Sequence, residues 1–211
     1  MGSNRIRMKL GFALLAGIFI LSLGVAPAHA NSITLNITPG SPTLAAGIWT
    51  YTYDVSVGAG DFFSTTNPGR NGGPIGTFFT FYDFAGYVPG SATAAIAGTT
   101  WAVSTPNTGV TPGAVVVTDN AGVVNVVFTY NTVATTTFPL GGVIGTVSLQ
   151  STFGPGANAI NWAGQDQQGT GGVDDSVGTV TGPTAGVPEP ASLFLLGTGL
   201  FSLGVFKRKR R

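Results

Sequence analysis

Alternation of apolar and polar residues with a period of two is the dominant pattern between residues 31 and 186. It is clearest over residues 48–57, where aromatic and valine positions alternate with threonine, serine and aspartate. Successive side chains of a strand point to opposite faces, so this spacing predicts a strand with one buried face. The apolar positions are Trp49, Tyr51, Tyr53, Val55 and Val57.

Similar alternation, or a short β-branched and aromatic run between turn residues, predicts eight further strands. Glycine, proline and asparagine separate these runs, and residues 119–122 are predicted to form a hairpin turn. The pattern predicts an all-β antiparallel sandwich of jelly-roll or immunoglobulin-like architecture, with a closed barrel as the alternative. The predicted strands are residues 33–37, 48–57, 77–84, 93–103, 114–118, 124–130, 143–150, 159–162 and 176–180.

The first thirty residues have the three parts of a signal peptide. Arg5, Arg7 and Lys9 precede an apolar run over residues 10–25, and Ala28 and Ala30 have the small-x-small spacing of a cleavage site. We therefore expect signal peptidase to remove residues 1–30 and the mature chain to begin with the next residue. An uncleaved N-terminal anchor is the alternative.

The last residues combine a proline pair, an apolar run and a basic tail. Pro188, Glu189 and Pro190 precede residues 191–206, which are apolar, and residues 207–211 are all lysine or arginine. As a helix the run spans about 24 Å, somewhat less than a hydrocarbon core of about 30 Å. The cations are expected to stay on the cytoplasmic side. These features predict one transmembrane helix that holds the protein temporarily.

This order of triplet, apolar helix and basic end resembles the PEP-CTERM sorting signal of Gram-negative bacteria over residues 187–211. The resemblance implies that an exosortase recognises Pro188, Glu189 and Pro190 and cleaves near them. It also implies that the body reaches the cell surface or the exopolysaccharide matrix after transient anchoring in the inner membrane. An ordinary C-terminal membrane anchor with a proline-rich stalk is the alternative.

Between the two targeting segments we expect one folded domain. The sandwich is assigned to residues 31–165. Residues 166–186 are glycine-rich and polar, and they are predicted to grade from a last strand into a flexible stalk.

Composition excludes several classes of function for residues 31–186. One arginine, Arg70, stands against seven aspartates, which gives a net charge of −6 and argues against binding to nucleic acid or to an anionic membrane surface. Cysteine, lysine and histidine are all missing from this part of the sequence. Cysteine and serine-histidine nucleophiles, Schiff bases and histidine-bound metals are therefore excluded.

Carboxylates are the remaining groups with acid-base or metal-binding chemistry. A pair of them can hydrolyse a glycosidic bond, and Asp54, Asp61, Asp83 and Asp119 are candidates in principle. Asp54 has an ordinary role on a polar strand face, Asp119 has one in a turn, and no residue pattern indicates a catalytic acid. We therefore expect no enzymatic activity and keep a glycoside hydrolase as the less favoured alternative.

Three aspartates in the glycine-rich segment suggest a calcium site. Asp166, Asp174 and Asp175 provide hard oxygen ligands close together in the sequence. Their spacing matches neither an EF-hand nor an RTX repeat, and a solvated acidic loop is the alternative.

Aromatic residues near turns suggest contact with carbohydrate, because exposed rings can stack on sugars. Phe62 and Phe63 follow Asp61, and Tyr87 precedes a proline and a glycine. The same rings could instead cap the sandwich core. We expect an exported surface or matrix protein with a structural or adhesive role in exopolysaccharide, biofilm or floc, and a carbohydrate-binding module is the alternative.

Overall fold

The computed structural model describes residues 33–66, 69–169 and 171–184. The predicted signal peptide, the Pro188 to Pro190 triplet, the apolar run and the basic tail lie outside the described residues. The described residues form twelve strands and one 3-10 turn. These are β1 (Thr34–Ile37), β2 (Thr43–Ala45), β3 (Ile48–Val57), β4 (Asp61–Phe63), η1 (Arg70–Gly72), β5 (Phe78–Phe81), β6 (Thr93–Ile96), β7 (Trp101–Ser104), β8 (Val126–Tyr130), β9 (Thr136–Phe138), β10 (Gly142–Ser151), β11 (Pro155–Gln167) and β12 (Val173–Pro183).

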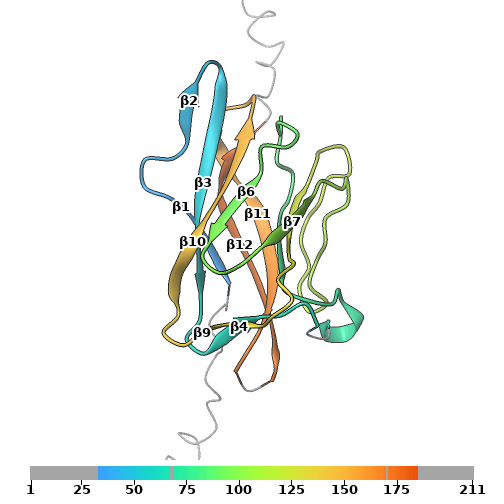
Figure 1. Ribbon diagram of the computed structural model, residues 1–211. Helices are drawn as coiled ribbons and strands as arrows, with labels where there is room; N and C mark the ends of the chain where they lie inside the picture. The colour runs from blue at the N-terminus through green and yellow to red at the C-terminus, as the bar shows by residue number, and fades with distance from the viewer. Residues whose placement is uncertain (1–32, 67–68, 170, 185–211) are drawn as a thin grey trace, which may run out of the picture. The chain divides into compact units, whose positions relative to one another are not determined.

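The strands form two antiparallel sheets that pack face to face (Figure 1). The first sheet has the order β1-β3-β10-β6, and β2 also pairs with β3. The second has the order β7-β8-β5-β11-β4-β9, and β12 pairs with the other side of β11. The predicted all-β antiparallel sandwich is confirmed. No helix among the described residues is long and apolar enough to cross a membrane.

Strand β3 is the centre of the first sheet and follows the predicted alternation. Tyr51, Tyr53, Val55 and Val57 are buried, and the polar residues between them are half-buried on the outer face. Strand β10 pairs along the whole of β3, with a bulge between Val143 and Gly145. A side chain at residue 145 would meet the backbone of the neighbouring strand β6 at 2.4 Å, so the bulge requires glycine.

Aromatic rings fill the space between the sheets. Tyr53 of β3 contacts Phe81 of β5 with ring centroids 4.7 Å apart, and Tyr51 contacts Phe84 at 5.6 Å. Such contacts each contribute about 0.5–1.5 kcal/mol beyond the area that they bury. All four rings are fully buried. Aromatic packing therefore contributes a large part of the contact between the sheets.

Each buried tyrosine hydroxyl donates a hydrogen bond to a carbonyl of another segment. Tyr51 reaches Phe153 O at 3.1 Å and Tyr53 reaches Thr181 O at 3.0 Å. Burial raises the pKa of Tyr51 to about 12 and raises the pKa of Tyr53 as well, with a smaller contribution from Tyr51. These phenols therefore remain neutral donors that fix backbone at the ends of the sheets.

A long loop, residues 105–125, covers the outer face of the second sheet (Figure 1). Thr80 and Tyr82 are fully buried on that face, and both hydroxyls donate to Val110 O, at 2.7 and 2.8 Å. Gly109 lies so close that a side chain there would approach the Tyr82 ring to 2.5 Å. The loop thus forms a partial third layer, although it has no regular secondary structure.

Two predicted strands differ in the structure. Residues 93–103 are not one strand: a turn containing Gly98, with φ 73°, separates β6 in the first sheet from β7 in the second. Residues 114–118 form no strand and belong to the covering loop, so residues 119–122 do not join a hairpin. Residues 114–118 pair with no strand of either sheet.

The glycine-rich segment after residue 164 is more ordered than the sequence predicted. Residues 173–183 form β12, which pairs with β11 from Gln167 opposite Val173 to Pro155 opposite Pro183. The predicted last strand over residues 176–180 lies within β12, which is longer at both ends than predicted and belongs to the second sheet. The short strands β2, β4 and β9 were not predicted, because three residues are too few to show a period.

Burial predicts the stability effect of a matched pair of substitutions. Val126 is fully buried in the core, whereas Val133 is 99% exposed. Val126→Ala should lower the free energy of unfolding by about 2 kcal/mol, because it removes two buried methyl groups and leaves a cavity. Val133→Ala should change it by less than about 0.5 kcal/mol. Urea unfolding curves check this, and equal effects of the two changes would contradict the assigned core.

Candidate functional site

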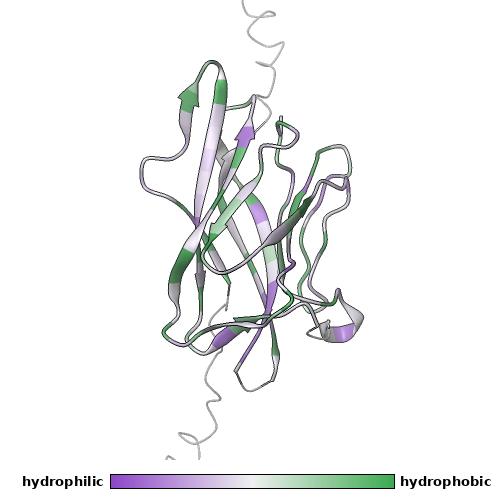
Figure 2. Cartoon of the chain, viewed as in Figure 1, coloured by the Kyte–Doolittle hydropathy of each residue, from purple (hydrophilic) through white to green (hydrophobic). Residues whose placement is uncertain are grey.

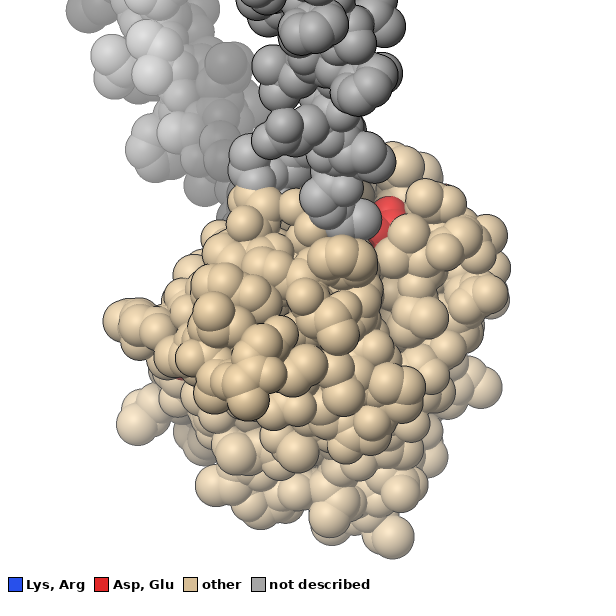
Figure 3. Space-filling view, turned by 90° about the horizontal axis from the view of Figure 1, so that it is seen from above, with Lys and Arg blue, Asp and Glu red and all other residues tan. Residues whose placement is uncertain are grey.

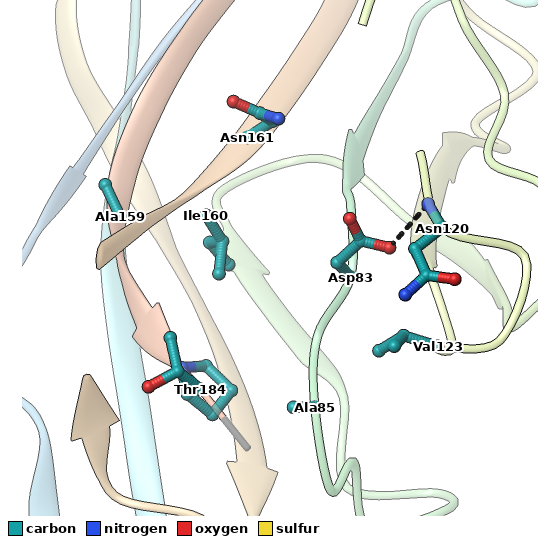
Figure 4. A pocket seen from close by; sticks show the side chains of 9 residues that line it. Asp83, Ala85, Asn120, Val123, Ala159, Ile160, Asn161 and Thr184 are labelled. Atoms are coloured by element: carbon teal, nitrogen blue, oxygen red, sulfur yellow. Dashed lines mark hydrogen bonds between the residues drawn. The ribbon is translucent and has the colours of Figure 1, made fainter. Parts of the chain in front are cut away.

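A pocket of about 230 Å³ lies where β11 and β12 meet the segment after β5 (Figure 4). Strand β11 and the end of β12 form one wall, and residues 83–85 with the covering loop form the other. The wall contains both apolar and polar side chains. The lining residues are Asp83, Ala85, Asn120, Val123, Ala159, Ile160, Asn161, Pro183 and Thr184.

Asp83 has an unusual backbone conformation in this pocket. Its φ of 54° lies in the left-handed region, which aspartate and asparagine tolerate better than most residues. Its N–H donates to Asn125 Oδ1 at 2.9 Å, and the flanking Tyr82 and Phe84 N–H groups donate to Asn161 O and Val124 O, each at 2.9 Å. These three bonds impose the conformation that turns the Asp83 carboxylate toward the pocket.

A second aspartate fixes the covering loop behind the pocket. Asp119 accepts from Asn125 Nδ2 at 3.0 Å and from Gly109 N at 2.8 Å, so each of its carboxylate oxygens has a partner. Asn120, the next residue, donates its N–H to Asp83 Oδ1 at 3.0 Å (Figure 4). Asn125 therefore links the two aspartates, and the network positions the pocket wall.

The surroundings of the Asp83 carboxylate disfavour its ionised form. Burial raises the pKa of Asp83, and the nearby Asp119 carboxylate adds to the increase, while the Asn120 N–H lowers it. Asp83 is the only ionisable side chain that lines the pocket. The site therefore offers one carboxylate, amide groups and an apolar wall.

The three predicted calcium ligands do not converge. Asp166 lies opposite Asp174 in the register of β11 and β12, whereas Asp175 lies opposite Gln165, on the other face of this strand pair. Asp174 accepts from Gln168, and Asp175 accepts from the Ala114 N–H at 3.0 Å. Among the described residues, no group of three or more acidic, histidine or cysteine side chains is placed to hold a metal ion.

The three predicted sugar-stacking rings lie in different surroundings. Phe63 is fully buried and packs against Phe138 and Trp101, at 4.7 and 5.3 Å, so its face is not available to a ligand. Phe62 is half-buried on β4, with its strand neighbours on both sides. Tyr87 is half-buried against Phe84. The prediction is corrected for Phe63, and the structure does not gather the other two rings at the pocket.

The described chain is thus an antiparallel two-sheet sandwich with a carboxylate-bearing pocket. Residues 186–211 match the family model of the PEP-CTERM protein-sorting motif, one residue longer than the predicted 187–211. The chain therefore carries a PEP-CTERM protein-sorting motif over these residues, and this motif implies export and recognition by an exosortase. No curated protein and no solved structure matches the chain significantly.

The sequence did not predict the pocket: of its lining residues only Asp83 was a candidate, as an isolated acid, and Asp119 of the supporting network was another. Asn125 is 42 positions from Asp83, and Ile160 and Asn161 are still more distant in the chain. Residues so far apart in the chain form no local sequence pattern that would indicate a shared site. Only the turn-forming character of residues 119–122 pointed to this region.

The network predicts a large effect for its buried amide. Asn125→Ala leaves the Asp83 N–H and one Asp119 oxygen without their partner, so it should lower the free energy of unfolding by about 1–3 kcal/mol. Asn36 is exposed on β1, and Asn36→Ala is the matched control, with an expected change below about 0.5 kcal/mol. Urea unfolding measures both. A negligible effect at Asn125 would show that the network is not formed.

The raised pKa of Asp83 predicts a pH dependence of stability. The folded chain binds this proton more tightly than the unfolded chain, whose carboxyl has the ordinary pKa of 3.8. The protonated group therefore contributes stability that is present below the unfolded pKa and is lost as the pH rises through the folded pKa. Asp83→Asn should gain stability relative to the native chain as the pH rises from about 4 to 7. Urea unfolding at both pH values tests this, and a constant difference would refute it.

Proposed function

We propose that the protein is a non-enzymatic surface or extracellular-matrix protein with a structural or adhesive role beside exopolysaccharide. The match of residues 186–211 to the sorting motif carries this proposal. An exosortase recognises the Pro188 to Pro190 triplet, and the apolar run after it holds the chain in the inner membrane until cleavage. The sandwich is then delivered outside the cell.

The surface of the sandwich supports a place in hydrated polysaccharide. The outer face of the first sheet carries hydroxyl and amide side chains in register, with Thr52 beside Ser148 and Thr50 beside Gln150. Charged atoms are sparse on the face in Figure 3, and much of β3 is pale in Figure 2, which marks intermediate hydropathy. Such a surface exchanges hydrogen bonds with sugars and water without strong electrostatic repulsion.

The arrangement of carboxylates supports the absence of catalysis. Hydrolysis of a glycosidic bond by the usual route requires two carboxyl groups that face the same bond. Asp83 is the one carboxylate among the residues that line the pocket. Both carboxylate oxygens of the neighbouring Asp119 already accept hydrogen bonds, from Asn125 and Gly109. The pocket is thus suited to binding more than to turnover.

Replacing Pro188, Glu189 and Pro190 with alanine should abolish processing. The variant should keep residues 207–211 and remain in the membrane fraction, because the exosortase no longer recognises it. The unchanged chain should give an extracellular product that starts at Asn31 and ends near the triplet. Intact-mass spectrometry of cell fractions measures both forms.

Cells that lack the exosortase provide the control for this experiment. The unchanged chain should accumulate there with its basic tail, as the variant does in normal cells. Release of the tail in either case would overturn the sorting role and, with it, the main support for a matrix function.

A further inference from the structure

The pocket contains a carboxylate whose charge the described protein leaves largely uncompensated. Asp83 is half-buried and receives one hydrogen bond, from the Asn120 N–H. The nearest charged group that acts on it is Asp119, which is also negative. A half-buried carboxylate beside another acid favours a cationic partner, because a neutral ligand would displace water without supplying charge.

The remaining polar groups define where a ligand can bond. No hydrogen bond among the described residues occupies the second carboxylate oxygen of Asp83 or the side-chain nitrogen of Asn120. Figure 4 shows this Asn120 nitrogen turned toward the space between Asp83 and Val123. The pocket thus presents an anionic acceptor and a neutral donor side by side.

The apolar wall and the volume limit the size of the ligand. Ile160 and Ala85 are buried and line the pocket together with Pro183, so the wall can accept the C–H face of a small ring. The volume of about 230 Å³ is below the range of pockets for drug-sized molecules, which begins at about 300 Å³. A single six-membered ring with short substituents is the fitting size.

We infer that this pocket binds a hexosamine with a free amino group. The ammonium group of the sugar forms an ion pair with Asp83, and a sugar hydroxyl accepts a hydrogen bond from Asn120. The inference goes beyond the sorting role and rests on the pocket. A partly de-N-acetylated polysaccharide would present such units at chain ends.

The test is calorimetric titration of the full chain with glucosamine near neutral pH. The chain is purified in a polyoxyethylene detergent, because sugar-based detergents could compete for the pocket. We expect saturable binding of glucosamine and binding of N-acetylglucosamine and glucose that is at least about tenfold weaker, since neither carries the charge. Ethanolamine, which has the amine but no ring, should also bind at least about tenfold more weakly.

Asp83→Asn isolates the charge. Asparagine tolerates the left-handed backbone and can still accept from the Asn120 N–H, so the pocket should keep its shape. Affinity for glucosamine should fall at least about tenfold. Asp54→Asn is the matched control, because Asp54 lies on the outer face of the first sheet, where it accepts from Thr38 at 2.7 Å. It should bind glucosamine as the native chain does.

Three results would overturn the inference. They are no saturable binding of glucosamine, equal binding of the neutral sugars or of ethanolamine, and equal losses in the Asp83 and Asp54 variants. Urea unfolding of both variants confirms that each is folded. Because the titration requires neither export nor exosortase, its failure leaves the sorting role intact, and failure of the processing experiment leaves the pocket intact.

Discussion

Aromatic contact between the two sheets is the interaction on which the rest of this structure depends. The sequence contains no cysteine, so no disulfide can tie the sheets together. Tyr53 on Phe81 and Tyr51 on Phe84 supply the link, and both tyrosines face inward because strand residues alternate. A shift of β3 by one position would expose these rings and bury threonine instead. The aromatic positions therefore fix the register as well as the core.

Other buried hydroxyls, on the outer face of the second sheet, extend this order to a part of the chain without regular structure. Tyr82 and Thr80 hold the covering loop through Val110 O, and Asp119 with Asn125 holds its last part. The loop thereby reaches Asp83 and completes the pocket. The pocket wall is thus held in place by hydrogen bonds between the second sheet and the covering loop.

The sequence predicted the fold better than the site, for physical reasons that particular residues show. Period two over 48–57 specified β3, because one face is buried and the other is not. Residues 114–118 have the composition of a strand but pair with no strand of either sheet, and the sequence does not reveal which segments pair. Phe63 resembled a loop aromatic and is instead core, while Asp83 and Asn125 meet only through the tertiary structure.

The position of the last strand shows that the sorting motif and the folded sandwich occupy separate parts of the chain. Strand β12 ends at Pro183, where it pairs with Pro155, and Thr184 is the last residue that lines the pocket. The sorting motif begins only at residue 186. Cleavage near Pro188 to Pro190 would therefore remove no strand pair, no core side chain and no pocket residue of the described sandwich. The sorting motif and the described sandwich thus use separate residues, and processing at the motif would leave the sandwich folded.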